Sequence, residues 1–201
     1  MLWSRHHFFE SRDMSDIAVQ KQAARKAAMA TRKAAHIAAK GAGAAAAAHM
    51  LAWLETTPPL HFISGYMPIY SELDILPAMH KLHERGYAVS VPVIMGNAQP
   101  LKFRAWTPEV AMVKGPFGAL VPESGEWHRP ELLLCPMLAF DPSGQRMGYG
   151  GGFYDRSIAA LSPVRAMGYA YAAQQVKNLP HEPTDMPLDG VITETGIIWS
   201  A

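Results

Sequence analysis

A glycine-rich segment in the last third of the chain carries residue types whose spacing points to a definite chemistry. Four of the five positions from 148 to 152 are glycine, with Arg146 before them and Asp155 after them. Because glycine has no Cβ, neighbouring amides can converge on an anion in conformations that other residues resist. Arginine can bind phosphate oxygens with a fork of donors, and aspartate is a hard oxygen ligand that suits magnesium. The segment therefore indicates a site for a magnesium-bound polyphosphate, with a turn selected for its shape alone as the alternative.

Two familiar phosphate-binding motifs do not fit this segment. The P-loop motif requires a lysine directly after its last glycine, but Gly152 is followed by Phe153. The dinucleotide motif requires glycine at its sixth position, which is Phe153 when counted from Gly148 and is not glycine when counted from Gly150 either. The sequence therefore predicts neither a P-loop NTPase nor a site for NAD.

The elements that must position this segment alternate between helices and strands. Runs of strong helix formers predict a helix over residues 17–39, which the Gly41-Ala-Gly43 sequence ends, and a second helix over 44–55. The other expected elements are strands over 60–66, 88–94, 101–106, 132–136, 164–170 and 191–193 and helices over about 72–85 and 153–161. Because several strands are apolar on both faces, the alternation predicts an α/β fold with a largely parallel sheet covered by helices on both sides. The glycine-rich segment then lies beyond the carboxyl end of a strand, where ligands bind in such sheets.

The composition limits the class of protein. The chain has 201 residues, of which 49% are hydrophobic, and this suits one well-buried core. Its formal net charge of +1 gives no basic surface for bulk nucleic-acid binding. Cys135 is the single cysteine, which excludes internal disulfides and cysteine-rich zinc sites and is compatible with a reducing compartment. No apolar run reaches the about 18 residues that span a bilayer. We therefore expect a single cytoplasmic domain with no nucleic-acid or membrane partner.

Residues 1–14 are interpreted as an extension that precedes the domain. They lack the long apolar region and the cleavage site of a secretory signal. Ser15 and Asp16, which follow Met14, could cap the first expected helix. We therefore expect residues 1–14 to be disordered and residues 15–201 to form one domain.

The pattern from Arg146 to Asp155, Arg-x-Gly-x-Gly-Gly-Gly-Phe-Tyr-Asp, resembles the signature of the 5-formyltetrahydrofolate cyclo-ligase family, whose members are also called methenyltetrahydrofolate synthetases. Three further segments resemble elements of the same family: Lys21-Gln-Ala-Ala-Arg25, Met67-Pro-Ile-Tyr-Ser-Glu-Leu-Asp74 and Asp185-Met-Pro-Leu-Asp189. Together they cover nearly the whole chain beyond Met14. One departure concerns Gly151, which stands where relatives can have a lysine, so Arg146 must contribute more to phosphate binding.

Two of these segments have alternative interpretations. Lys21 and Arg25 are four residues apart, a spacing that also occurs on solvated helix faces. Glu72 could be an acidic residue in the first turn of the helix over 72–85, capped by Ser71, instead of a carboxylate that binds a ligand.

The resemblance implies both a fold and a reaction. The implied fold is a three-layer α/β sandwich with a mostly parallel central sheet covered by helices, like that of the NagB, RpiA and CoA-transferase group. The implied reaction is the ATP-dependent cyclisation of 5-formyltetrahydrofolate to 5,10-methenyltetrahydrofolate, with release of ADP and phosphate. In it the formyl oxygen attacks the γ-phosphate, and N10 closes the ring on the activated formyl carbon as phosphate leaves. ATP and Mg²⁺ are the implied cofactors, and the folate, with or without a polyglutamate tail, is the implied partner of a monomer.

The resemblance also implies a role for each matching residue. Catalysis is implied for Arg146 and Lys21. Nucleotide binding is implied for Lys21, Gln22, Ala23, Ala24, Arg25, Arg146, Met147, Gly148, Tyr149, Gly150, Gly151, Gly152, Phe153 and Tyr154. Folate binding is implied for Met67, Glu72, Tyr149, Gly150, Gly151, Gly152 and Phe153. The implied magnesium ligands are Asp155 and Asp189.

Two other classes of protein stay open at this stage. One is a Mg-ATP-dependent kinase or transferase that shares the glycine-rich segment but uses another acceptor. The other is a non-catalytic module that binds a nucleotide or a folate on the same fold, since fold does not fix function. The joint presence of Lys21, Arg146 and the two aspartates argues against the second class.

Overall fold

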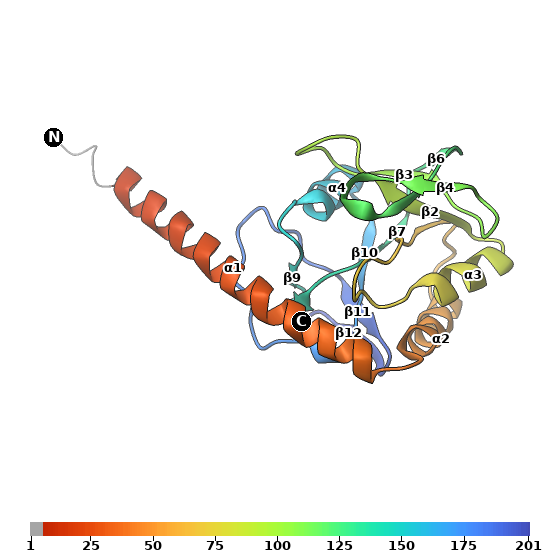
Figure 1. Ribbon diagram of the computed structural model, residues 1–201, viewed down its shortest axis with the longest axis horizontal. Helices are drawn as coiled ribbons and strands as arrows, with labels where there is room; N and C mark the ends of the chain where they lie inside the picture. Colours follow the sequence, from red (N-terminus) through yellow and green to blue (C-terminus); the bar gives the residue numbers. More distant parts are fainter. Residues whose placement is uncertain (1–5) are drawn as a thin grey trace.

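A long helix opens the described part of the chain. The computed structural model describes residues 6–201, with side chains from Asp16 onward, and its first element is α1 (His6–Ala38). The expected helix over 17–39 is present, but it begins earlier, so residues 6–14 are helical and differ from the expected disorder. Figure 1 shows the N-terminal part of α1 projecting from the rest of the molecule. Within residues 6–201, no helix combines the length and the apolar character that crossing a membrane requires.

Five parallel strands form the centre of an eight-stranded sheet. They lie in the order β11 (Gly190–Thr193), β10 (Arg165–Tyr169), β7 (Leu132–Cys135), β1 (Phe62–Ser64) and β2 (Ala88–Val93). Antiparallel strands complete both edges: β12 (Gly196–Trp199) beside β11, and β3 (Lys102–Ala105) and then β6 (Trp127–His128) beside β2. All six expected strands are therefore found, and the mostly parallel sheet is confirmed.

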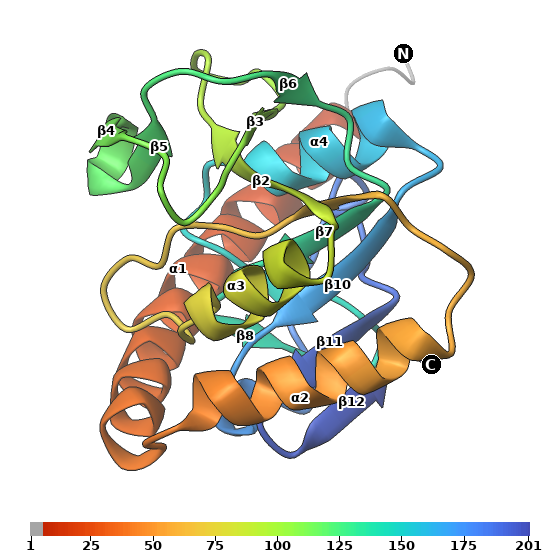
Figure 2. The ribbon, with the colours of Figure 1, turned by 90° about the vertical axis from the view of Figure 1, so that its right-hand side faces the viewer.

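Helices cover both faces of this sheet, as the residues of β7 show. The covering helices are α2 (Ala42–Glu55), α3 (Leu76–Glu84) and α4 (Phe153–Leu161). Leu132 and Leu134 pack into the core cluster that includes α2 and α3. Leu133 and Cys135 point to the opposite face and pack in the cluster that contains Ile158 of α4. Because successive side chains of a strand face opposite sides, a strand covered on both sides must be apolar throughout. The expected three-layer sandwich is confirmed (Figure 2).

The helix expected over 72–85 begins later, at Leu76. Pro77 lies in its first turn, where proline is favoured because its fixed φ suits the helix and its missing N–H is not needed. The Asp74 carboxylate accepts a hydrogen bond from the Leu76 amide at 3.0 Å. Glu72 is therefore outside the helix, and its interpretation as a first-turn acid is wrong.

Two short antiparallel hairpins lie outside the expected elements. They are β4 (Met112–Lys114) with β5 (Leu120–Pro122), joined through the 3-10 helix η1 (Pro116–Gly118), and β8 (Ala139–Phe140) with β9 (Arg146–Met147). Strands of two or three residues are too short to show an alternation of apolar and polar side chains. The second hairpin connects β7 to the glycine-rich segment, so Arg146 lies on a strand.

α1 lies across the segments that follow the carboxyl ends of the central strands. Arg32 donates a hydrogen bond to the carbonyl of Met137, just beyond β7, at 3.1 Å. His36 Nδ1 lies 3.0 Å from the hydroxyl of Tyr171, just beyond β10. The turn into α2 uses Gly41, whose φ of 77° is in the left-handed region that favours glycine. The N-terminal helix thus reaches the same edge of the sheet as the glycine-rich segment.

Candidate active site

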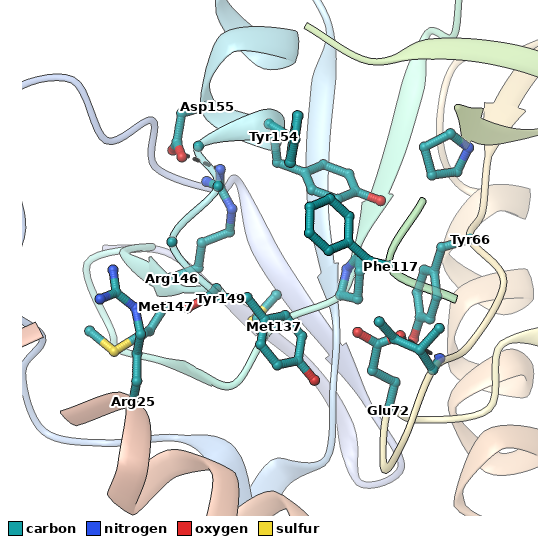
Figure 3. Close-up of a pocket in the computed structure, with 18 of the residues that line it drawn as sticks. Arg25, Tyr66, Glu72, Phe117, Met137, Arg146, Met147, Tyr149, Tyr154 and Asp155 are labelled. Carbon is teal, nitrogen blue, oxygen red and sulfur yellow. Dashed lines mark hydrogen bonds and ion pairs between the residues drawn. The ribbon is translucent and has the colours of Figure 1, made fainter. Parts of the chain in front are cut away.

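A large cavity opens at the carboxyl edge of the sheet. Its volume is ≈ 1460 Å³, whereas typical small-molecule pockets occupy about 300–1,000 Å³. Its lining comes from α1, the loop between β1 and α3, the β4–β5 hairpin, the glycine-rich segment and residues 180–186 (Figure 3). The walls therefore come from parts of the chain that are far apart in sequence, and the cavity has room for two ligands of ordinary size.

Arg146 and Asp155 form a close pair in the wall of this cavity. Arg146 Nη2 donates to Asp155 Oδ1 at 2.7 Å, and the Arg146 side chain is 6% exposed. The same oxygen accepts a hydrogen bond from the Met186 amide at 3.0 Å, while Arg146 Nη1 donates to the Met186 carbonyl. Asp155 lies in the first turn of α4, where the helix dipole favours negative charge. The two charged residues that flank the glycines in sequence therefore meet across them in space.

Two of the glycines adopt backbone conformations that other residues resist. Gly150 has φ 98° and Gly152, which immediately precedes α4, has φ 62°. A Cβ on Gly150 would lie 3.3 Å from the guanidinium of Arg25. The glycines thus allow the backbone to turn into the N-terminus of α4 while the α1 side chains approach it closely.

Lys21 and Arg25 bring α1 to the cavity. Lys21 Nζ donates to Glu182 Oε2 at 2.7 Å and to Asp185 Oδ2 at 2.6 Å. Burial lowers the pKa of Lys21, but the hydrogen bonds to these two carboxylates outweigh it and raise the pKa above its usual value. Arg25 Nε donates to the carbonyl of Gly148 at 3.2 Å. The pair is therefore not an ordinary solvated helix face, because both cations line the cavity.

Glu72 supplies a buried carboxylate at another wall. The residue is 6% exposed, and its Oε2 accepts a hydrogen bond from the Ile69 amide at 2.9 Å. Its Oε1 lies 3.6 Å from Arg32 Nη1. Burial raises the pKa of Glu72 to about 7, although the Ile69 amide and the Arg32 cation both act in the opposite direction. A carboxyl group in this position can change its charge near neutral pH.

Aromatic side chains complete the cavity, and three of them, Tyr66, Tyr70 and Phe117, were not among the expected ligand-binding residues. Phe117, at the tip of the β4–β5 hairpin, is 68% exposed and has φ 59°, and its ring meets that of Phe153 edge-on at 6.3 Å. The hydroxyl of Tyr154 is buried and has no hydrogen-bond partner among the described residues. Figure 3 shows the rings of Phe117 and Tyr154 facing the same space. The turn residues Gly115 and Pro116, directly before Phe117, are the sequence signal that could have indicated this hairpin tip.

The structure brings most of the expected ligand-binding residues together. Those that line the cavity are Lys21, Arg25, Met67, Glu72, Arg146, Met147, Gly148, Tyr149, Gly150, Gly151, Gly152, Phe153, Tyr154 and Asp155. Those outside the lining are Gln22, Ala23, Ala24 and Asp189. Gln22 and Ala23 are exposed on α1, which is expected of a helix that turns a single face to the cavity.

Asp189 lies at the opposite end of a strand from the cavity. It directly precedes β11, and its Oδ2 accepts a hydrogen bond from the Ala166 amide at 2.8 Å. The amino ends of parallel strands and their carboxyl ends lie at opposite edges of a sheet. Asp185, four residues earlier, is the acidic residue of this segment that lines the cavity. Asp189, predicted as the second magnesium ligand, therefore does not line the cavity in which Asp155 lies.

The side chains of the cavity can bind a metal ion only together with ligands that the protein does not supply. Among the described residues, no group of three or more His, Cys, Asp or Glu side chains is arranged to hold a metal ion. Magnesium usually binds one or two carboxylates together with substrate phosphates and water. Asp155 is a carboxylate of this kind, close to the amides that would face a phosphate. A magnesium ion carried by a polyphosphate therefore fits this cavity, and a metal site made only of protein ligands does not.

A family model described as the 5-formyltetrahydrofolate cyclo-ligase family matches residues 17–194. The chain belongs to this family. The reaction of cyclo-ligases is the ATP-dependent cyclisation of 5-formyltetrahydrofolate to 5,10-methenyltetrahydrofolate. Family membership thus selects the cyclo-ligase reaction over a kinase with another acceptor and over a non-catalytic module.

Similar proteins cover most of the chain. The 5-formyltetrahydrofolate cyclo-ligase of Escherichia coli K12 is 32% identical over 153 residues, which are 71% of this chain and 84% of the relative. The cyclo-ligase of Haemophilus influenzae is 36% identical over 141 residues, 65% of this chain and 74% of the relative.

Solved structures support the fold. The 5,10-methenyltetrahydrofolate synthetase of Mycoplasma pneumoniae superimposes with a TM-score of 0.70 at 22% identity, covering 87% of this chain and 98% of that chain. The synthetase of Aquifex aeolicus, determined by NMR, gives a TM-score of 0.72 at 24% identity, covering 89% and 92%. At these sequence identities the structural similarity supports the fold alone. The roles of single residues are inferred from the geometry of this chain.

Proposed function

We propose that this cyclo-ligase holds Mg-ATP and 5-formyltetrahydrofolate together in the cavity and aligns the formyl oxygen with the γ-phosphate. One observation carries the proposal: a single cavity is lined both by the glycine-rich segment with Arg146 and by the buried carboxylate of Glu72. Phosphoryl transfer requires from the protein mainly positioning and neutralisation of charge. A cavity with cations on one side and a carboxylate with aromatic rings on the other can provide both.

The nucleotide would bind along the cationic side. Lys21 and Arg146 each form ion pairs with carboxylates, so their N–H donors already point toward negative charge. A polyphosphate carries more charge than a carboxylate and can replace these partners. The backbone amides of residues 150–152 lead into the N-terminus of α4, which adds partial positive charge at the same place. Lys21, Arg25, Arg146 and these amides would together position the phosphates and neutralise the charge that develops during transfer.

Asp155 would hold the magnesium ion. A magnesium ion held there would neutralise the charge of the phosphate groups during transfer. Asp155 lies in the lining of the cavity at the start of α4 and is the charged neighbour of Arg146. Phosphate oxygens and water would provide the remaining ligands. Asp189 is not included, because its carboxylate hydrogen-bonds to the Ala166 amide outside the cavity.

The folate would bind between Glu72 and the aromatic side chains. An ionised carboxylate can accept hydrogen bonds from an amino-pyrimidine edge, and Glu72 is buried at the cavity wall. Met67, Phe117 and Tyr154 also line the cavity and offer apolar surface to a flat ring. The unpaired Tyr154 hydroxyl is available to a polar group of the ligand.

The reaction then depends on the relative positions of the γ-phosphate and the pterin ring. The oxygen of an N5-formyl amide is a poor leaving group, and phosphorylation converts it into a good one. The formyl oxygen bonds to the γ-phosphorus as ADP leaves; N10 then bonds to the formyl carbon and gives up its proton, and the C–O bond breaks with release of phosphate. Residues that hold the γ-phosphate and the pterin ring at fixed separation make both steps intramolecular.

The test is direct. We expect the purified chain to convert 5-formyltetrahydrofolate into the methenyl chromophore when Mg-ATP is present and not when ATP or Mg²⁺ is omitted. ADP and methenyl product should form in equal amounts. Folded protein that shows no ATP-dependent turnover would sink the proposal, and ATP hydrolysis without the chromophore would favour another acceptor.

Four further properties belong to the same proposal. We propose that residues 15–201 form one catalytic domain, that it acts as a monomer, and that it works in the cytoplasm on folates with or without a polyglutamate tail. Support for the domain comes from the family match over residues 17–194, and the buried free thiol of Cys135 is consistent with a reducing compartment. Light scattering tests the monomer, and a comparison of KM for folates of different tail length tests the range of substrates.

A further inference from the structure

Arg32 is unlike its neighbours on α1. Much of the described surface of this helix is exposed, yet Arg32 is 2% exposed. A buried guanidinium is unfavourable unless its charge and its N–H donors find partners. The partners of Arg32 therefore indicate what this residue does.

Arg32 contacts three separate segments at once. Its Nε donates to Ser71 Oγ at 3.2 Å, and its Nη1 donates to the Met137 carbonyl at 3.1 Å. Its Nη2 donates to the hydroxyl of Tyr149, and the guanidinium lies over the Tyr149 ring, 5.4 Å from the centroid. Nη1 also lies 3.6 Å from Glu72 Oε1.

These contacts join the two proposed halves of the active site. Ser71 and Glu72 belong to the segment that would receive the folate, and Tyr149 belongs to the glycine-rich segment that would receive the phosphates. In Figure 3 the ring of Tyr149 lies between Arg25 and Glu72, on the line from the nucleotide side to the folate side. The planar, rigid guanidinium of Arg32 thus contacts both the folate side and the nucleotide side of the cavity.

We propose that Arg32 is a positioning residue that couples the two ligands, so that binding of either one favours binding of the other. A nucleotide that orders the glycine-rich segment fixes Tyr149, and through Arg32 it fixes the orientation of Glu72 toward the folate. By linkage, the folate must strengthen nucleotide binding by the same factor. The proposal rests on the proposed function, because it takes Glu72 as the folate carboxylate and the glycine-rich segment as the phosphate site.

A purely structural role for Arg32 would have different consequences. Loss of a buried side chain that only filled space would lower stability and would weaken each ligand separately. It would leave unchanged the factor by which one ligand alters the affinity of the other. That factor is therefore the quantity to measure.

The experiment is a titration that involves no turnover. The Kd of a non-hydrolysable ATP analogue with Mg²⁺ is measured by calorimetry with and without saturating 5-formyltetrahydrofolate, and the ratio of the two values is the coupling factor. We expect a factor of about 5 or more in the unaltered enzyme, within the usual range for coupled sites. Arg32→Lys keeps the charge but loses the fork of donors, so its factor should fall to about 1. Tyr149→Phe removes the hydroxyl that Arg32 contacts and should act in the same direction.

Lys26→Gln is the matched control. Lys26 is an exposed cation on the same helix and lies outside the cavity lining, so its coupling factor should equal that of the unaltered enzyme. A circular-dichroism melting curve checks that each variant is folded. If Arg32→Lys does not fold, Tyr149→Phe decides, because it deletes a single hydroxyl from a side chain that is 47% exposed.

The outcomes separate the two proposals. Turnover with Mg-ATP together with a coupling factor of 1 in the unaltered enzyme overturns the role of Arg32 and leaves the proposed function standing. A folded Arg32→Lys or Tyr149→Phe protein that keeps the full factor overturns it as well. Failure of the unaltered enzyme to bind either ligand overturns both proposals.

Discussion

Glu72 has the most consequential protonation equilibrium in the cavity. Burial raises its pKa from 4.5 to about 7 in the folded protein. Between these two values the folded state holds a proton that the unfolded state has released, so the free energy of unfolding must fall as pH rises from about 4.5 to about 7. The full shift corresponds to about 3 kcal/mol. We expect Glu72→Gln to remove this decline, as measured by urea unfolding at several pH values between 4.5 and 8.

The control for this prediction is another glutamate. Glu84, at the exposed end of α3, carries a carboxyl group that is not buried. Glu84→Gln should retain the decline of stability over the same pH range. Equal pH profiles for Glu72→Gln and the unaltered protein would show that Glu72 is ionised in the folded state well below pH 7.

Asp155 offers a separate test of the metal assignment. In Asp155→Asn the remaining carbonyl oxygen can still accept from Arg146 and from the Met186 amide, so the local fold is expected to survive. The loss of a metal-binding charge should lower turnover by roughly 10- to 100-fold or more and shift the Mg²⁺ requirement to higher concentration. Turnover measured against Mg²⁺ concentration checks both effects.

Asp189→Asn is the comparison for this variant. Asparagine keeps the acceptor for the Ala166 amide, and Asp189 does not line the cavity. We expect a much smaller change in the Mg²⁺ requirement than for Asp155→Asn. Equal losses in the two variants would mean that the segment before β11 rearranges when the nucleotide binds.

Single residues differ in how well the sequence predicts their place. Arg146 and Asp155 flank a run of glycines, so local spacing alone brings them together. Asp189 matches a family segment. Whether its side chain reaches the cavity depends on where β11 begins and on the register of that strand in the sheet, and the sequence specifies neither. Arg32 is one of several cations on α1, and its burial becomes evident only when three distant segments are packed around it.

At the scale of elements, the β4–β5 hairpin is a part of the cavity wall that was not predicted from the sequence. Its tip places Phe117 in the lining with a left-handed backbone, a conformation that costs free energy for an aromatic residue and therefore calls for a compensating role. We expect Phe117→Ala to raise the KM for 5-formyltetrahydrofolate roughly tenfold, because an aromatic contact contributes about 1 kcal/mol or more to a flat ligand. The KM for ATP should change little.

The matched control lies on the same hairpin. Val113 is on β4 and outside the cavity lining, and it is 39% exposed. Val113→Ala should leave both KM values unchanged. A rise in the KM for ATP as large as that for the folate in Phe117→Ala would place the hairpin over the nucleotide instead.

Elements were predictable where their own sequence carried a repeating pattern. The two long helices, the buried strands and α4 show helical composition or continuous apolar runs, and the structure contains all of them. The hairpins are held by pairing between two or three residues from each side, and no periodicity can appear in so short a run. α3 begins later than expected because Pro77 and Asp74 determine where its first turn starts.

At the scale of the whole molecule, the active site exists only because α1 lies against the carboxyl edge of the sheet. The buried apolar side chains of the described part of α1 are alanines, Ala28 and Ala35, which bury little area. Polar contacts from Lys21, Arg25 and Arg32 provide most of the attachment of α1 to the rest of the molecule. Since these contacts all lie in the cavity, ligands and the attachment of α1 must influence each other.

This arrangement predicts where ligand binding will change the dynamics. Without ligand, α1 is anchored by few apolar contacts, so its amides should exchange with deuterium through local opening, faster than those of α2, which has seven buried residues. A nucleotide analogue with Mg²⁺ at about 100 times its Kd stabilises the closed form by about 2.7 kcal/mol, which slows exchange through such openings up to about 100-fold. Hydrogen exchange followed by mass spectrometry should therefore show the protection of residues 17–38 rising toward that of α2. If α1 were as protected as α2 before the ligand is added, or unchanged after it, the helix would be held by the core and not by the site.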